Sequence, residues 1–351
     1  MQRLDSLDFL RGWASVLVVI SHLIGVFWVS QSGLQSLMGY PNIGETTLPY
    51  ANWIIENKLF FGQFGVAIFF LISGYVITLS LEKYHGFGFL INRIIRIYPV
   101  YIVGFLFLIL GLYIVDFDQD GIPYTTKHLL IHALIVVRQW FDYKRIDGIS
   151  WTLEIELYFY VVMFIVFQFN SVRRNTIINI LIIVFLLGAI LLPIDWYTSR
   201  QLLMITYMLI GYYFYNLKNN NSSIWQFILY LVIILTCMFI FYSSHKPFNL
   251  DVYTWSLPYI ITPLIFFIML NRFTNYKIDK VSKFLSKISY PLYVVHPIFG
   301  YALLAYFLKE GYSSWTALIF VLCIVITLAY IIHLLIEQPA LKYAKKFNHK
   351  K

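Results

Sequence analysis

The chain has 351 residues, of which 60% are hydrophobic, 19% aromatic and only 12% charged, and its mean hydropathy is +0.73. Soluble domains are less apolar and more highly charged, so this composition excludes an ordinary soluble protein and indicates many membrane-spanning helices. The formal net charge of +9 lies mostly in the polar stretches between apolar segments. We therefore expect these charges to meet membrane lipids and not nucleic acid.

Ten segments are apolar over a length that crosses a bilayer, since about 20 helical residues at 1.5 Å rise match its hydrocarbon core. They predict an all-α integral membrane protein with about ten transmembrane helices, at 8–29, 59–80, 97–115, 150–168, 176–194, 201–217, 224–242, 253–270, 285–307 and 315–336. The apolar run His128–Val137 is shorter and suits an interfacial or re-entrant segment better than a span.

The Lys and Arg residues between the spans predict the orientation of the chain. With ten spans, most of the 26 Lys and Arg residues lie on the side of the N-terminus, and the positive-inside rule then places both termini in the cytoplasm. We expect a multi-pass protein of the cell membrane, with one transmembrane domain over 1–340 and a basic cytoplasmic tail over 341–351. Cys237 and Cys323 have neither the spacing of a disulfide framework nor that of a metal site.

The first predicted span carries Arg11 near one end and His22 farther along. Ionisable side chains inside a span cost about 2.5–3.5 kcal/mol on insertion scales, so each is a candidate functional residue. The two positions are separated by three helical turns plus roughly 20°, which places them on one face and about 16 Å apart along the axis. The alternative is an arginine that reaches the interface and a histidine that bonds between helices.

The segment NRIIRIYPVY places Arg93 and Arg96 one helical turn apart, just before a span on the predicted cytoplasmic side. Two guanidinium groups in this arrangement suit a phosphate or pyrophosphate group, which arginine binds bidentately. The alternative is ordinary topology-determining charge in a cytoplasmic loop.

The segment SWTLEIELYFY enters the membrane from the predicted outer side, with Ser150 as its expected N-cap. Glu154 and Glu156 follow in the first turns, where the helix dipole favours carboxylates. Because residues two apart point about 200° away from each other, only one of the two can face a central site. Glu156 is the deeper one and shares a face with Tyr160.

The segment ISYPLYVVHPIF places His296 in the middle of a span and Pro297 directly after it. Proline removes a backbone donor and is expected to bend the helix at this point. Such a bend either opens a cavity beside the histidine or is purely structural.

Four of these segments, taken in order, resemble the integral-membrane acyltransferase-3 family of membrane O-acyltransferases. LDFLRG followed by His22 is similar to the family's pattern of Arg, ten residues and His. The other similar motifs are FGVAIFFLISGY (Phe64–Tyr75), RIIRIYP (Arg93–Pro99) and WTLEIELYFY (Trp151–Tyr160). The chain departs from the family pattern at Ala67, where many members carry an acid, at Glu154, where a neutral residue is expected, and at Pro297, which follows His296 without an intervening residue.

The resemblance implies an enzyme that moves an acyl group, commonly acetyl, from cytoplasmic acyl-CoA to a hydroxyl group, typically of a carbohydrate across the membrane. It implies that Arg11 and His22 form the functional pair, that Arg93 and Arg96 contact the phosphates of CoA, and that Glu156 is the matching acid. Acyl-CoA is then a donor substrate, and no permanently bound cofactor is expected.

Imidazole suits proton transfer near neutral pH, so we expect His22 to act as a general base on the acceptor hydroxyl. A covalent acyl-histidine relay is the alternative mechanism. Glu156 would orient the imidazole or contact the sugar, and His296, Ser73 and Tyr160 would line the site.

The alternative function is a transporter or flippase of a lipid-linked sugar, for which internal repeats and interrupted helices would be expected. Loops usually carry recognition, so we expect the outer segments Ser30–Lys58 and Asp116–Ile149 to select the acceptor, either an exopolysaccharide or a lipid-linked glycan. The sequence leaves the acyl group, the acceptor and self-association into a homo-oligomer open.

Overall fold

The computed structural model describes residues 5–30, 33–34, 48, 53, 61–84, 86–115, 124–245, 252–273 and 276–347. Within these ranges the chain folds into helices joined by short connections, which confirms the predicted all-α class. Most of the outer segment Ser30–Lys58, and the first part of Asp116–Ile149, lie outside the described residues.

Each of the ten predicted apolar segments falls on a helix. In chain order the long helices are α1 (Asp5–Ile20), α5 (Phe61–Lys83), α6 (Gly88–Val115), α8 (Ser150–Val166), α9 (Ser171–Leu191), α10 (Trp196–Lys218), α11 (Ile224–His245), α12 (Val252–Arg272), α13 (Lys280–Val295), α14 (Ile298–Lys309) and α15 (Ser314–Ile332). The short elements are the π-helical turn η1 (Ser21–Val26) and α2 (Phe27–Val29) after α1, α7 (Thr126–Ala133) and the 3₁₀ helix η2 (Ile135–Phe141) before α8, and the π-helical turn η4 (His333–Glu337), α16 (Gln338–Ala344) and η5 (Lys345–Phe347) at the C-terminal end.

Seven helices among the described residues are long and apolar enough to cross a membrane. If the bent pair α13 and α14 is counted as one span, the number rises to eight. Two further predicted spans, α8 and α10, do not meet that criterion, and α8 has only 17 residues. In α10 every residue from Leu203 to Asn216 is buried, so this helix is covered by other helices and presents little surface to lipid. The short elements α7 and η2 contain the run His128–Val137, and neither is long enough to cross a bilayer.

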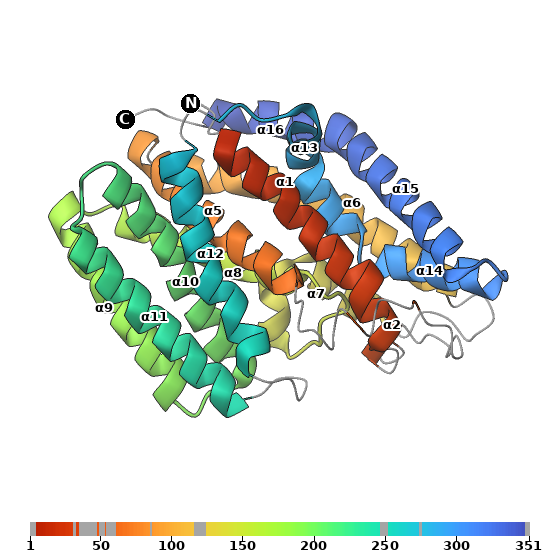
Figure 1. The fold of residues 1–351 in the computed structure, drawn as a ribbon, viewed down its shortest axis with the longest axis horizontal. Helices are drawn as coiled ribbons and strands as arrows, with labels where there is room; N and C mark the ends of the chain where they lie inside the picture. The colour runs from red at the N-terminus through yellow and green to blue at the C-terminus, as the bar shows by residue number, and fades with distance from the viewer. Residues whose placement is uncertain are drawn as a thin grey trace.

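The helices form two groups that meet at α5 (Figure 1). On one side α5 packs against α1, which packs against α13, and on the other side it packs against α10 and α12. The contact between α5 and α10 is close because two glycines meet there: a Cβ atom on Gly74 would lie 2.0 Å from the carbonyl oxygen of Met208, and one on Gly211 would lie 2.5 Å from that of Leu71. Small residues at such crossings let two helix backbones approach each other.

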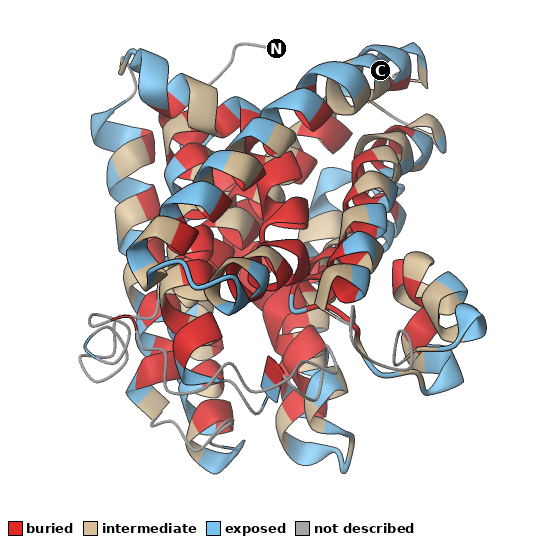
Figure 2. Cartoon of the chain, turned by 90° about the vertical axis from the view of Figure 1, so that its right-hand side faces the viewer, coloured by how far each residue is buried: buried red, intermediate tan, exposed pale blue. Residues whose placement is uncertain are grey.

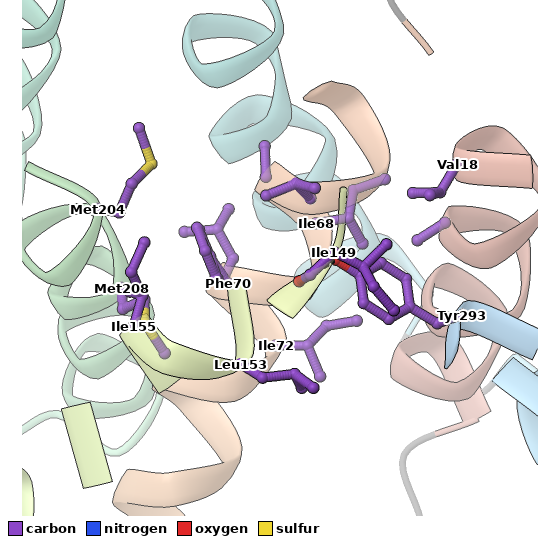
Figure 3. Close-up of a cluster of buried hydrophobic side chains, with 14 of the residues drawn as sticks. Val18, Ile68, Phe70, Ile72, Ile149, Leu153, Ile155, Met204, Met208 and Tyr293 are labelled. Carbon is purple, nitrogen blue, oxygen red and sulfur yellow. Dashed lines mark hydrogen bonds between the residues drawn. The ribbon is translucent and has the colours of Figure 1, made fainter. Parts of the chain in front are cut away.

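Buried residues lie where the helices face one another, and exposed residues lie on the outside of the bundle (Figure 2). One core cluster joins side chains from α1, α5, α8, α10 and α13, and includes Val18, Phe70, Leu153, Met208 and Tyr293 (Figure 3). Many exposed side chains on α9, α11 and α15 are nonetheless large and apolar, such as Ile180, Val232 and Ile319. An exposed apolar surface of this kind suits contact with lipid.

The helix pair α13 and α14 is bent by 72° at His296 and Pro297, as the proline predicts. After the bend, α14 packs against α6 and α15. At the other end of the bundle, the start of α1 and the helix α16 lie close to the same edge (Figure 1), and Asn92 Nδ2 ties α6 to this edge by donating to the carbonyl oxygen of Ala344 at 2.6 Å.

Candidate active site

Two histidines, His22 and His296, lie in contact where the first span changes from an α-helix to a π-helical turn. The π-helical turn η1 begins at Ser21 and contains His22, and such turns often occur at functional sites. His22 Nδ1 lies 3.0 Å from His296 Nε2, and the two ring centroids are 5.0 Å apart. His296 is fully buried, whereas His22 is only partly buried, so His22 is the accessible member of the pair.

The hydrogen bonds of the pair define which nitrogen is free. His296 Nδ1 lies 2.9 Å from the carbonyl oxygen of Leu292, and a carbonyl only accepts, so Nδ1 carries the hydrogen. In neutral His296 the Nε2 atom is then an acceptor, and it receives the Nδ1 hydrogen of His22. The Nε2 atom of His22 is left with a lone pair, which is the state that a general base needs.

Aromatic rings and one loop surround this pair. Tyr301 packs 6.1 Å from the His22 ring, and Tyr293 packs 6.0 Å from the His296 ring. From the predicted outer side, a Cβ atom placed on Gly148 would lie 4.0 Å from Cε1 of His22. The end of the segment Asp116–Ile149 therefore reaches the histidine, and glycine at position 148 leaves space beside the ring.

Glu156 forms a second polar contact, between α5 and α8. Its Oε1 accepts a hydrogen bond from Ser73 Oγ at 2.8 Å and a second, short one from the hydroxyl of Tyr160. The predicted shared face of Glu156 and Tyr160 thus brings the two side chains into contact. The ring of His22 is oriented by His296 and not by Glu156.

The three predicted arginines lie together at the end of the bundle where α1 begins. Arg11, Arg93 and Arg96 each lie within electrostatic range of the other two. Arg93 is buried, donates to Ser80 Oγ at 2.6 Å, and has its guanidinium carbon 5.8 Å from the centroid of the Tyr160 ring. We call Arg11, Arg93 and Arg96 the arginine cluster.

One acid near the arginine cluster, Glu337, was not identified from the sequence. It belongs to the π-helical turn η4, and its Oε2 lies 2.6 Å from His333 Nδ1. A histidine and an acid four residues apart at the end of the last apolar segment share a helix face, and this spacing is the signal that could have predicted the pair.

Polar side chains on α8 and α13 lie between the arginine cluster and the histidine pair. On α13, the hydroxyl of Tyr290 lies within electrostatic range of Glu156 and Glu337. One turn further along, the hydroxyl of Tyr293 lies 2.6 Å from Thr152 Oγ1 on α8. We call these side chains between the two groups the polar axis.

Glu154 points away from the polar axis and joins two arginines of the outer segment. Its carboxylate lies 3.2 Å from Arg138 Nη2 and 2.9 Å from Arg145 Nη2, and it is almost completely buried. The ion pairs confirm that Glu154 and Glu156 face different surroundings, and they show that Glu154 has more than a helix-dipole role. Burial lowers the pKa of Arg145, and the charge of Glu154 opposes that shift.

The predicted N-cap of α8 at Ser150 is wrong, because the N-cap is Ile149, which has no side-chain cap bond. Asp147, just before it, instead accepts hydrogen bonds at Oδ1 from the backbone N–H groups of Ile149 and Ser150. Asp147 Oδ1 also lies 4.0 Å from Nε2 of the fully buried His132. Burial lowers the pKa of His132 to about 4, and the charge of Asp147 opposes this shift, so His132 is neutral at physiological pH.

The fold is that of a multi-pass membrane protein, in which a free imidazole nitrogen and a cluster of cations lie inside an apolar bundle with polar side chains between them. Residues 4–334 match the acyltransferase-3 family, described as an acyltransferase domain, and the chain belongs to this family. Among curated proteins it is similar to Nodulation protein 10 of Rhizobium leguminosarum bv. viciae, with 27% identity over 175 residues. The aligned region covers 45% of this chain and 43% of that protein. No solved structure gives a significant match.

Proposed function

We propose that this membrane acyltransferase moves an acyl group, most simply acetyl, from cytoplasmic acyl-CoA to a hydroxyl group of a carbohydrate, in the cell membrane. The polar axis between the arginine cluster and the histidine pair is the observation that carries this proposal. Family membership supports acyl transfer over the transporter or flippase that the sequence left open.

The arginine cluster is suited to the donor. CoA carries a pyrophosphate and a further phosphate, and guanidinium groups bind such oxygens through paired charge-assisted hydrogen bonds. The three cations repel one another, and Asp8, Glu156 and Glu337 offset part of that repulsion. A bound polyanion would relieve the rest. From Arg11, the pantetheine arm of CoA would extend toward His22, about 16 Å further along the first helix.

The histidine pair is suited to the chemical step. The acceptor hydroxyl oxygen attacks the thioester carbonyl carbon while His22 Nε2 takes the hydroxyl proton. The bond between carbon and sulfur then breaks, and the CoA thiolate leaves and receives the proton from His22. His296 accepts the Nδ1 hydrogen bond of His22 and thereby stabilises the positive charge that develops on that ring.

The covalent alternative places the acyl group on His22 Nε2 before it reaches the acceptor. Wild-type protein incubated with labelled acetyl-CoA and no acceptor distinguishes the two routes. Under the general-base route no label stays on the protein after rapid denaturation, whereas label recovered on His22 would establish the relay.

The test of the function uses purified protein in lipid vesicles with radiolabelled acetyl-CoA and a panel of glycan acceptors. We expect label on a glycan with the wild type and a loss of at least about 100-fold in His22→Gln. His245→Gln is the control, because His245 is also a helix histidine with Nδ1 bonded to a backbone carbonyl, that of Phe241 at 3.0 Å, but it is exposed and far along the chain from the pair. Full transfer by a folded His22→Gln variant would overturn the mechanism.

A further inference from the structure

A fourth arginine, Arg200, lies one turn into α10 and away from the arginine cluster. It is 8% exposed, and three tryptophan rings surround its guanidinium carbon. The ring centroids lie at 3.6 Å for Trp151, 5.2 Å for Trp196 and 5.9 Å for Trp255. Cation–π contacts of this kind stabilise a buried guanidinium, but they supply no counter-charge.

Arg200 has no ion-pair partner in the part of the chain that the structure describes. Its Nε atom has no hydrogen bond. The hydroxyls of Tyr242 and Tyr259 lie within reach of its charge, yet neither completes a hydrogen bond of ordinary geometry. A buried cation is normally paired, because desolvation of an unpaired charge is costly.

Next to Arg200 lies a narrow surface depression, whose wall includes Arg145, Trp151, Tyr197 and Gln201. The guanidinium of Arg145 lies 4.7 Å from the centroid of the Tyr197 ring, and Tyr197 is 52% exposed, so the depression is open to the surface. It thus combines two guanidinium groups with aromatic faces. That combination suits an anionic group attached to an apolar ring face, as in an acidic sugar.

The local charges also favour an anion. Glu154 pairs with Arg138 and Arg145, and the nearby Asp195 accepts hydrogen bonds from the backbone of Tyr197 and Thr198. Among these arginines, Arg200 is the one that no carboxylate of the described residues contacts.

The depression is connected to the polar axis. Trp151 precedes Thr152, whose Oγ1 lies 2.6 Å from the hydroxyl of Tyr293, and the Tyr293 ring packs against His296 at 6.0 Å. The charge of Arg200 also reaches the hydroxyl of Tyr293. Tyr293 therefore stands between Arg200 and the histidine pair.

We infer that Arg200 is the anion-binding residue of an acceptor subsite, and that the acceptor carries a carboxylate or phosphate group on its carbohydrate. Arg200 binds the anionic oxygens, Arg145 adds positive charge, and the half-exposed ring of Tyr197 offers a face on which a sugar stacks. The role as acceptor rests on the proposed function, whereas anion binding does not. The competing explanation is a purely structural contact between α8, α10 and α12.

Binding can be tested without acyl transfer, because Arg200 is surrounded by tryptophans. The full-length protein in lipid nanodiscs is titrated with sodium glucuronate, glucose 1-phosphate and glucose while tryptophan fluorescence is recorded. We expect a saturable change with at least one of the two anions, and a response to glucose at least about tenfold weaker. A response to glucuronate alone supports a carboxylate, and one to glucose 1-phosphate alone supports a phosphate.

Two variants and one control decide whether Arg200 is responsible. In Arg200→Gln the anion affinity should fall at least about tenfold. In Tyr197→Ala, which changes an exposed side chain and leaves the core intact, it should fall about threefold or more. The control Arg174→Gln should keep wild-type affinity, because Arg174 packs over Phe167 in the same manner but is paired with Glu82.

The inference is overturned if the folded wild type responds to neither anion, if glucose responds equally, or if both Arg200→Gln and Tyr197→Ala keep wild-type affinity. Should Arg200→Gln not fold, the result for Tyr197→Ala alone decides. Anion binding without any acyl transfer would count against the proposed function and leave this binding site standing, so the two failures are distinguishable.

Discussion

The crossing of α5 and α10 provides a sharp test of how packing supports the candidate site. In Gly74→Ala the new Cβ atom would lie 2.0 Å from the carbonyl oxygen of Met208 and 3.1 Å from the Cα atom of Gly211. These neighbours are backbone atoms of another helix, so no side-chain rotation can make room. The two helices must move apart.

The size of this movement is set by ordinary contact distances. A carbon and a carbonyl oxygen approach to about 3.3 Å, so α5 and α10 have to separate by about 1.3 Å at this point. Overpacking of this kind costs about 1–3 kcal/mol. Ser73 on α5 precedes Gly74 and donates to Glu156 on α8 at 2.8 Å. If α5 moves by about 1.3 Å relative to α8, that hydrogen bond breaks.

Thermal unfolding of the purified protein, with acyl transfer measured well below the transition, separates the two effects. Gly74→Ala should lower the apparent Tm by several degrees and reduce transfer as well. The matched control is Gly188→Ala in α9, where the nearest atom to the new Cβ is a methyl group of Leu202 at 3.4 Å. That variant should be neutral or stabilised by up to about 1 kcal/mol. Equal stability and activity of the two variants would refute this packing argument.

Three further outcomes test the network around the start of α8. Glu154→Gln leaves two buried arginines unpaired and should reduce the free energy of unfolding by about 3–5 kcal/mol. The control Glu82→Gln changes a carboxylate that is one-third exposed and should cost about 1 kcal/mol or less. Chemical denaturation compares the two variants, and equal losses of unfolding free energy would contradict the assignment of Glu154 as a buried ion-pair partner. Asp147→Ala removes the acceptor of two backbone N–H groups at the start of α8 and should cost about 0.5–2 kcal/mol in the same assay, like the loss of a helix cap. Burial lowers the pKa of His132 to about 4, so between about pH 6.5 and 4 the unfolded chain binds a proton that the folded protein does not. The free energy of unfolding should therefore fall as the pH drops through this window. An unchanged pH dependence of stability in His132→Phe would show that another group is responsible.

The sequence predicted the features that depend on local patterns. Apolar length located the helices, Pro297 located the bend of 72°, and a spacing of four residues brought Tyr160 to Glu156. The spacing of Arg93 and Arg96 likewise placed both residues in the arginine cluster. Each of these relations is set by geometry within a single helix.

Contacts between distant segments could not be predicted in this way. His296 is the ring partner of His22, and 274 positions separate the two residues, so no periodicity connects them. Arg138 and Glu154 pair across a turn whose shape the pattern does not define. Arg200 stands just before the predicted span 201–217, where an arginine is indistinguishable from an ordinary interfacial charge.

The π-helical turn Ser21–Val26 has a consequence for how insertions and deletions act on this chain. A π turn accommodates one residue more than an α turn, so it changes the rotational phase of the residues after it and leaves the residues before it in their original phase. Deleting one residue from its second half would convert it to an α turn and leave both Val18 and Phe27, which packs 5.7 Å from Tyr301, near their present orientation. The same deletion in a regular α-helix would turn the later residues by about 100°. The first helix can thus lose one residue at this point without turning the side chains that follow it.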